Sequence, residues 1–97
     1  MIEMSLIKIN GKSAVGLRIE MPQAPPLVLA RGERGVVFCG YLNPEAAEKF
    51  DLAAAIVRGV NNVDELLDKP VSYCTKRAES LGARSGMSGR EALGLFL

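Results

Sequence analysis

The stretch SLIKINGKSAVGLRIEM, residues 5–21, decides the fold of this chain. At its centre lies Asn10-Gly11, a dipeptide that favours the positive φ angles of a tight hairpin turn. After the turn the residues alternate, so that four apolar side chains share one face of an extended segment: Val15, Leu17, Ile19 and Met21. The sequence therefore predicts an antiparallel hairpin formed by residues 5–10 and 13–21.

Two further strands are predicted downstream, over Leu27–Arg31 and Val36–Leu42, with the turn sequence GERG between them. The segment Pro22–Pro26 should interrupt the hydrogen-bond ladder, because proline supplies no N–H. The run VVFC, residues 36–39, is apolar on both faces, so we expect this strand in the centre of the sheet.

The second half of the chain changes to helical signals. Asn43-Pro44 is a helix start, which predicts a short helix over Glu45–Phe50. Ala53–Val57 is ambiguous, because alanine favours helix whereas a short apolar run closed by Gly59 fits a buried strand; we favour the strand. Asn62 should cap a helix that ends before Pro70.

Two more helices are predicted towards the end of the chain. Apolar residues at helical spacing (Val71, Cys74, Ala78 and Leu81) indicate a helix over 71–81, and Gly82 is a natural stop. The last helix should run from Ser88 to about Phe96.

These elements predict one domain over residues 1–97. We expect a two-layer α+β fold, with a mostly antiparallel sheet of about five strands and helices packed on one face. The other face should carry Lys8, Arg18 and Glu20 together with much apolar surface. A domain of this size can cover such a face, or an edge strand, by self-association, so we expect a homo-oligomer.

Composition excludes several classes of function. The net charge of +1 and the absence of aromatics interleaved with basic residues make a nucleic-acid partner unlikely. No apolar run approaches a membrane span, no signal peptide is visible, and the two cysteines suit a reducing compartment, so we expect a cytoplasmic domain without a membrane partner. The chain contains no histidine, which excludes His-based triads and metal sites. The spacing of the acidic residues does not form a calcium loop, and we expect neither metal nor cofactor.

The most informative candidate site is SGMSGREAL, residues 85–93. Ser88 and Glu91 have the spacing of a capping box that starts the last helix. The same segment could instead receive an anion, with Arg84 and Arg90 as charge partners and the two glycines, Gly86 and Gly89, allowing close approach. Local capping is the simpler interpretation.

A second candidate site lies where the central strand ends. Cys39-Gly40 follows that strand and precedes a helix start, which is where ligands often bind in α/β proteins. Arg58, at the end of the predicted fifth strand, should project from the same edge and could pair with a carboxylate. Cys39 is either a small core thiol or a reactive one, and no histidine is present to act as its base. Cys74 is expected in the core of its helix.

Several of these segments together resemble the YunC-like domain, a small bacterial and archaeal family of unknown function. The resemblance is carried by VVFCGYL at 36–42, RGV at 58–60, DELL at 64–67 and GMSGREAL at 86–93. It implies a stand-alone α+β domain and supports a strand at 53–57, but it implies no activity, cofactor or catalytic residue. One departure is Asn43, where the family pattern has aspartate, and this weakens any acid–base mechanism at that position.

The sequence therefore gives two hypotheses for function. The leading one is a non-catalytic cytoplasmic module that self-associates and binds a small anionic ligand or a protein partner. The alternative is a small enzyme that uses Cys39 with Arg58 or Arg90 at the strand-end edge.

Overall fold

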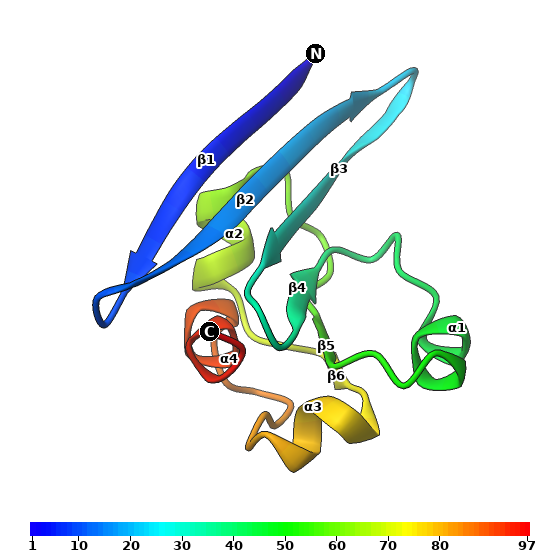
Figure 1. Cartoon of the computed structure of the whole chain (residues 1–97). Coiled ribbons are helices and arrows are strands. Elements are labelled where there is room, and N and C mark those ends of the chain that lie inside the picture. Colours follow the sequence, from blue (N-terminus) through cyan, green and yellow to red (C-terminus); the bar gives the residue numbers. More distant parts are fainter.

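The computed structural model describes all residues, 1–97, and contains one six-stranded sheet with the strands in sequence order (Figure 1). Neighbouring strands are antiparallel except β4 and β5, which are parallel. The strands are β1 (Ile2–Ile9), β2 (Lys12–Met21), β3 (Ala24–Arg31), β4 (Val36–Phe38), β5 (Ala54–Ile56) and β6 (Tyr73–Cys74). The predicted α+β fold is confirmed, with six strands in place of about five.

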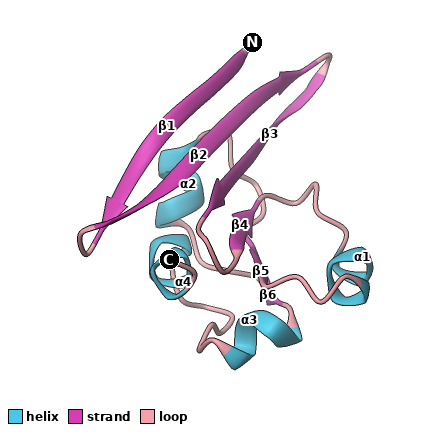
Figure 2. Ribbon diagram, in the orientation of Figure 1, coloured by secondary structure: helices cyan, strands magenta, loops and turns pink.

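Four short helices complete the chain (Figure 2): α1 (Pro44–Lys49), α2 (Val63–Asp68), α3 (Lys76–Ser80) and α4 (Gly89–Leu95). The predicted caps are present at three of them, because the side-chain oxygens of Asn43, Asn62 and Ser88 each accept a backbone N–H of the first turn. Residues 54–56 form strand β5, as we favoured.

The predicted helix over 71–81 is wrong in its first half. Tyr73–Cys74 pair with β5 as strand β6, and the helix begins only after Thr75. Thr75 is fully buried; its hydroxyl donates to the Leu52 carbonyl at 2.6 Å and accepts the N–H groups of Ala54 and Ala78. A threonine that caps a helix and ties it to a strand explains why the helix cannot begin earlier.

The proline segment also differs from the prediction. Only Pro22-Gln23 form the turn, and Pro25 and Pro26 lie inside β3. The β2–β3 register shifts there, so that both prolines lie opposite the single residue Glu20, which is a β-bulge. On its other side β3 pairs with β4 only from Val28 onwards, so neither proline has to donate to a ladder.

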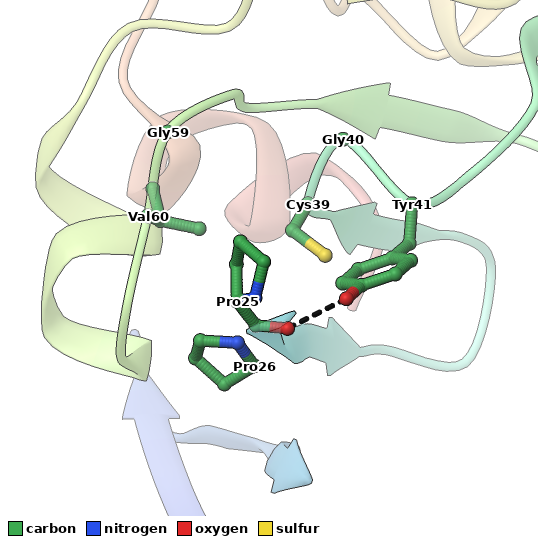
Figure 3. A pocket seen from close by; sticks show the side chains of 7 residues that line it. All are labelled: Pro25, Pro26, Cys39, Gly40, Tyr41, Gly59 and Val60. Atoms are coloured by element: carbon green, nitrogen blue, oxygen red, sulfur yellow. Dashed lines mark hydrogen bonds between the residues drawn. The ribbon is translucent and has the colours of Figure 1, made fainter. Parts of the chain in front are cut away.

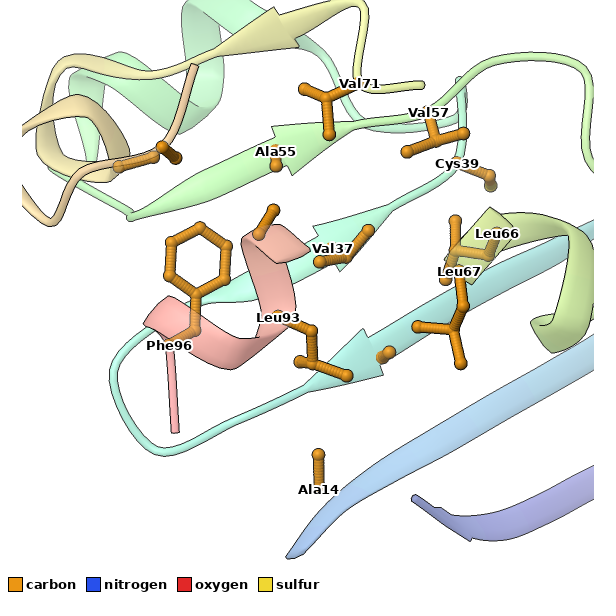
Figure 4. Packing of buried hydrophobic residues seen from close by; sticks show 14 of the residues in the cluster. Ala14, Val37, Cys39, Ala55, Val57, Leu66, Leu67, Val71, Leu93 and Phe96 are labelled. Carbon is orange, nitrogen blue, oxygen red and sulfur yellow. The ribbon is translucent and has the colours of Figure 1, made fainter. Parts of the chain in front are cut away.

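The main core lies between the sheet and the layer of α2 and α4 (Figure 4). The strand residues on this face are mostly small (Ala14, Gly16, Val28 and Ala30) and buried. At Gly16 a Cβ would lie 2.7 Å from Ser5 Oγ and 3.1 Å from Val63 Cγ1, so any larger residue would push against β1 and α2. Leu66, Leu67, Leu93 and Phe96 fill the space above them.

The opposite face of β1–β3 is mostly apolar and is left open over β1 and β2, while Leu29 of β3 packs against Val36, Ala47 and Ala54. We call it the open face and define it by Ile2, Met4, Leu6, Val15, Leu17, Ile19, Leu27 and Leu29, which share one side by strand register. Ile2, Met4 and Leu6 are 65%, 72% and 65% exposed. Lys8 and much apolar surface lie on this face as we expected, but Arg18 and Glu20 do not: Arg18 points to the helix side and donates to the Asn61 carbonyl at 2.8 Å.

Helix α1 follows the β4 end of the sheet and packs apart from the main core (Figure 1). Its Ala47 forms a small cluster with Val36 and Ala54, whose neighbours Val37 and Ala55 belong to the main core. Because side chains alternate along a strand, α1 packs on the same side of the sheet as the open face, over β4 and β5.

Candidate functional site at the ends of the parallel strands

A hollow of about 230 Å³ lies beyond the carboxyl ends of β4 and β5, the one parallel pair in the sheet (Figure 3). The loops that leave the two strands line it, together with the start of β3. The lining residues are Pro25, Pro26, Cys39, Gly40, Tyr41, Gly59 and Val60. The hollow exists because β4 ends at Phe38 while β3 continues, and the prolines of β3 cannot extend the ladder into the gap.

Tyr41 closes one side of the hollow. Its hydroxyl donates to the Pro25 carbonyl at 2.6 Å (Figure 3), which fixes the ring against the proline segment. The Pro25 carbonyl of β3, which no residue of β4 reaches, is therefore satisfied by a side chain. The tyrosine ring, the two prolines and Val60 make most of the wall apolar.

Cys39 lies at the inner end of the hollow and is only 3% exposed. Its sulfur accepts the Val28 N–H at 3.3 Å, and Figure 3 shows it on the side of the Tyr41 ring. Its carbonyl accepts the Leu42 N–H at 3.2 Å. The thiol is thus part of the wall rather than an exposed group.

Two cations lie next to the loops that line the hollow. A Cβ placed on Gly40 would lie 3.7 Å from Arg58 Nη1, so the guanidinium is beside this loop. Lys69 Nζ donates to the Gly59 carbonyl at 2.7 Å. Neither cation forms an ion pair with a carboxylate. The structure therefore brings Arg58 to the same edge as Cys39 and adds Lys69.

Backbone donors are also free on these loops. The N–H groups of Gly40, Tyr41, Gly59 and Val60 donate to no acceptor of the chain. Gly59 has φ +72°, a conformation that L side chains rarely adopt, so a glycine is required where this loop turns.

Sequence reasoning missed Tyr41, Val60 and the prolines as wall residues, because only the ending of β4 beside a continuing β3 brings them together.

The second candidate segment, residues 85–93, is closed on itself. The Glu91 N–H donates to the Ser88 hydroxyl at 3.1 Å, and Glu91 Oε1 accepts the Ser88 N–H at 3.0 Å. Gly89 is buried against α2, and a Cβ there would overlap the Leu66 carbonyl oxygen. Gly86 has φ +97°, so it serves the turn before the helix.

The two arginines near that segment are apart from the strand-end hollow. Arg84 Nη1 donates to the carbonyls of Glu79 and Ala83 at 2.9 and 2.6 Å, which satisfies groups at the end of α3. Arg90 is exposed beside a different hollow that Ile9 and Asn10 also line. Cys39, Arg58 and Arg90 therefore do not form one site.

A polar contact holds α1 to the strand–helix junction. The Tyr73 hydroxyl donates to Glu48 Oε2 at 2.5 Å, and the Lys76 N–H donates to Glu48 Oε1 at 3.1 Å. The hydrogen bond from Tyr73 lowers the pKa of the Glu48 carboxyl, and the same bond raises the pKa of the Tyr73 hydroxyl. Burial raises the pKa of the Cys74 thiol.

No group of three or more His, Cys, Asp or Glu side chains is placed to hold a metal ion. No helix of the structure is long and apolar enough to cross a bilayer.

The comparison with known families agrees with this architecture. The sequence model of "Domain of unknown function (DUF1805)" matches residues 38–96, from the last residue of β4 to the end of α4. The chain belongs to the DUF1805 family. The matched part of this DUF1805 domain contains both loops of the strand-end hollow and the capping box.

Two relatives extend the similarity to nearly the whole DUF1805 domain. The uncharacterized protein YunC of Bacillus subtilis is 35% identical over 98 residues, which cover 96% of this chain and 95% of the relative. This confirms the resemblance to YunC-like domains. A crystal structure of a protein of unknown function from Thermoplasma acidophilum superposes with a TM-score of 0.94 at 28% identity, covering 100% of this chain and 94% of that one.

Proposed function

We propose that this domain is a non-catalytic, self-associating module in which two copies pack their open faces together. The observation that supports this proposal is the exposure of Ile2, Met4 and Leu6, each about two-thirds exposed, on a sheet face that carries two more strands of apolar residues. Contiguous apolar patches of a few hundred Å² on a protein surface are often interaction sites.

A second copy is the partner that fits this face best. Over the eight-residue length of β1 and β3, the three strands present roughly 26 by 14 Å, or about 360 Å², which is in the range of functional surface patches. The face is apolar over most of its length and carries charge only at one end, where Lys8 and Arg31 lie by strand register, so its middle offers little charge pattern for recognising a different protein. Under a twofold axis the same patch meets itself, and two such sheets can interdigitate as in a β-sandwich.

The exposed edge of β1 gives the alternative mode of self-association. This strand pairs with β2 on one side only, so its other edge could join the β1 edge of a second copy. Packing of the open faces buries far more apolar surface than edge pairing does, and for this reason we favour it.

The non-catalytic part of the proposal is supported by the strand-end hollow. Cys39 is buried, no histidine exists to act as its base, and Arg90 lies beside another hollow. An enzyme here would depend on Cys39 and Arg58 alone. Because both cysteines are free and buried, we place the module in the cytoplasm.

Sedimentation equilibrium at protein concentrations between about 1 µM and 1 mM tests self-association. These concentrations cover dissociation constants of the same range, which correspond to binding free energies of about −8 to −4 kcal/mol. The expected result is a reversible monomer–dimer equilibrium. A monomer throughout this range would overturn the proposal. Alkylation of native protein by iodoacetamide tests the alternative: rapid modification of Cys39 would favour an enzyme, and modification only after unfolding would count against it.

A further inference from the structure

We infer that the strand-end hollow binds a small organic anion, with its carboxylate or phosphate group at the rim beside Arg58 and Lys69 and its apolar body between Tyr41 and Pro25. This site does not depend on the open face, and the inference stands or falls separately from self-association.

The first argument is topological. In sheets with parallel strands, ligands bind beyond the carboxyl ends of those strands, because the loops diverge there and leave a crevice. Here a single parallel pair exists, and the loops after both of its strands, 39–41 and 57–60, line the same hollow.

The second argument is electrostatic. The lining residues include no acidic side chain, whereas Arg58 and Lys69 lie next to the lining loops without a carboxylate partner. Arg58 forms no hydrogen bond or ion pair within the chain, whereas Lys69 also donates to the Gly59 carbonyl. An anion would receive a bidentate partner from the guanidinium and hydrogen bonds from the free N–H groups of the two loops.

The third argument concerns the body of the ligand. The volume of about 230 Å³ suits a molecule of modest size, and proline, tyrosine and valine side chains form most of its wall. An inorganic anion would make no apolar contact with these side chains, so we expect a ligand that carries an apolar group next to its charge. The buried Cys39 sulfur adds a polarisable surface at the inner end.

Gly40 gives an additional indication. A Cβ at this position would meet only Arg58 atoms, at 3.7 and 3.8 Å, which is ordinary contact, and its φ is not in the left-handed region. Neither the packing nor the backbone of this chain therefore demands glycine here. The missing side chain keeps the rim between Arg58 and the hollow open for a ligand.

The test uses amide chemical shifts of the full chain labelled with ¹⁵N, titrated with benzoate, phenyl phosphate, inorganic phosphate and neutral benzyl alcohol. We expect benzoate or phenyl phosphate to shift the amides of Gly40, Tyr41, Gly59 and Val60 with a saturable dependence. Inorganic phosphate and benzyl alcohol should bind at least tenfold more weakly, because phosphate lacks the apolar body and benzyl alcohol lacks the negative charge.

Two variants test whether Arg58 binds the negative charge of the ligand. Arg58→Gln should weaken the dissociation constant about tenfold, the usual effect of one charge-assisted hydrogen bond. Arg90→Gln is the matched control and should leave it unchanged. Arg58 is exposed and makes no hydrogen bond, so an unfolding midpoint equal to that of the unmodified protein verifies the fold. The inference would be overturned if benzyl alcohol bound as tightly as the organic anions. It would also be overturned by shifts centred on Ser88 and Arg90, or by the absence of a saturable shift with either organic anion.

Discussion

Leu6→Glu should separate the proposed dimer while leaving the monomer folded. Leu6 lies near the middle of β1 on the open face and is 65% exposed in the single chain. The substituted side chain therefore stands in solvent in the monomer, and the expected change in the free energy of unfolding is within about 0.5 kcal/mol.

The effect on association follows from the exposed fraction. Complete burial of a leucine side chain contributes about 1.5–3 kcal/mol, so the two-thirds that remain exposed can contribute about 1–2 kcal/mol in each copy. Both copies change in a homodimer, which gives about 2–4 kcal/mol, or a dissociation constant raised about 30- to 1,000-fold. Burying a carboxylate at the interface increases this further.

Sedimentation equilibrium is the assay, and Phe50→Glu is the matched control. Phe50 is 77% exposed but lies at the end of α1, away from β1–β3. We expect this control to associate like the unmodified protein. If Leu6→Glu leaves the dissociation constant unchanged, or if Phe50→Glu raises it as much, the open face is not the interface. A dimer joined through the β1 edge would give the first of these results.

Three further outcomes follow from the packing and the titrating groups. Gly89→Ala should lower the free energy of unfolding by about 3 kcal/mol in urea titrations, because its Cβ overlaps the Leu66 carbonyl; a loss below 1 kcal/mol would contradict this close contact. Because the pKa of Glu48 is lowered in the folded state, its contribution is present at neutral pH and disappears as pH falls through that value. The stability difference between the native protein and Glu48→Gln should therefore shrink on acidification; a difference that is constant with pH would refute this. Burial raises the pKa of Cys74, so this thiol should react with iodoacetamide at pH 8 more slowly than a free cysteine, and equal rates would exclude the effect.

The features that sequence predicted best are those decided by a few neighbouring residues. The capping box of Ser88 and Glu91 and the caps at Asn43 and Asn62 depend on hydrogen bonds within one turn, so their spacing alone predicts them. The Asn10-Gly11 hairpin is of the same kind, and both residues have positive φ.

The errors arose where distant residues decide. Val71, Cys74, Ala78 and Leu81 have helical spacing, but a buried strand followed by a capped helix buries the same residues, and pairing with β5 selects that arrangement. Thr75 could have been noticed as a cap, since threonine is a favoured N-cap and its hydroxyl accepts the N–H three residues later, here that of Ala78. The side of Arg18 and Glu20 was also predicted wrongly, because the side that helices cover depends on close approach at Gly16 and not on the larger apolar residues.

The candidate site was predicted in part. The end of the central strand indicated Cys39, Gly40 and Arg58, and these do lie at one edge. The other walls come from a segment that appeared only to be a chain break, because the bulge at Pro25 and Pro26 depends on the register between β2 and β3.

The position of Phe96 has a consequence for the order of folding. This fully buried side chain packs against the turn between β3 and β4, where a Cβ on Gly35 would lie 2.7 Å from its ring, and its carbonyl accepts the Arg34 N–H at 2.7 Å. The hairpins of β1–β3 can form early from local contacts, but their inner face stays exposed to water until α2 packs on it, and α2 in turn packs against α4 at the end of the chain. The meander alone should therefore have no stable fold, and helix docking should be the step that makes folding cooperative. During synthesis, both faces of the first three strands remain uncovered at least until α2 has emerged.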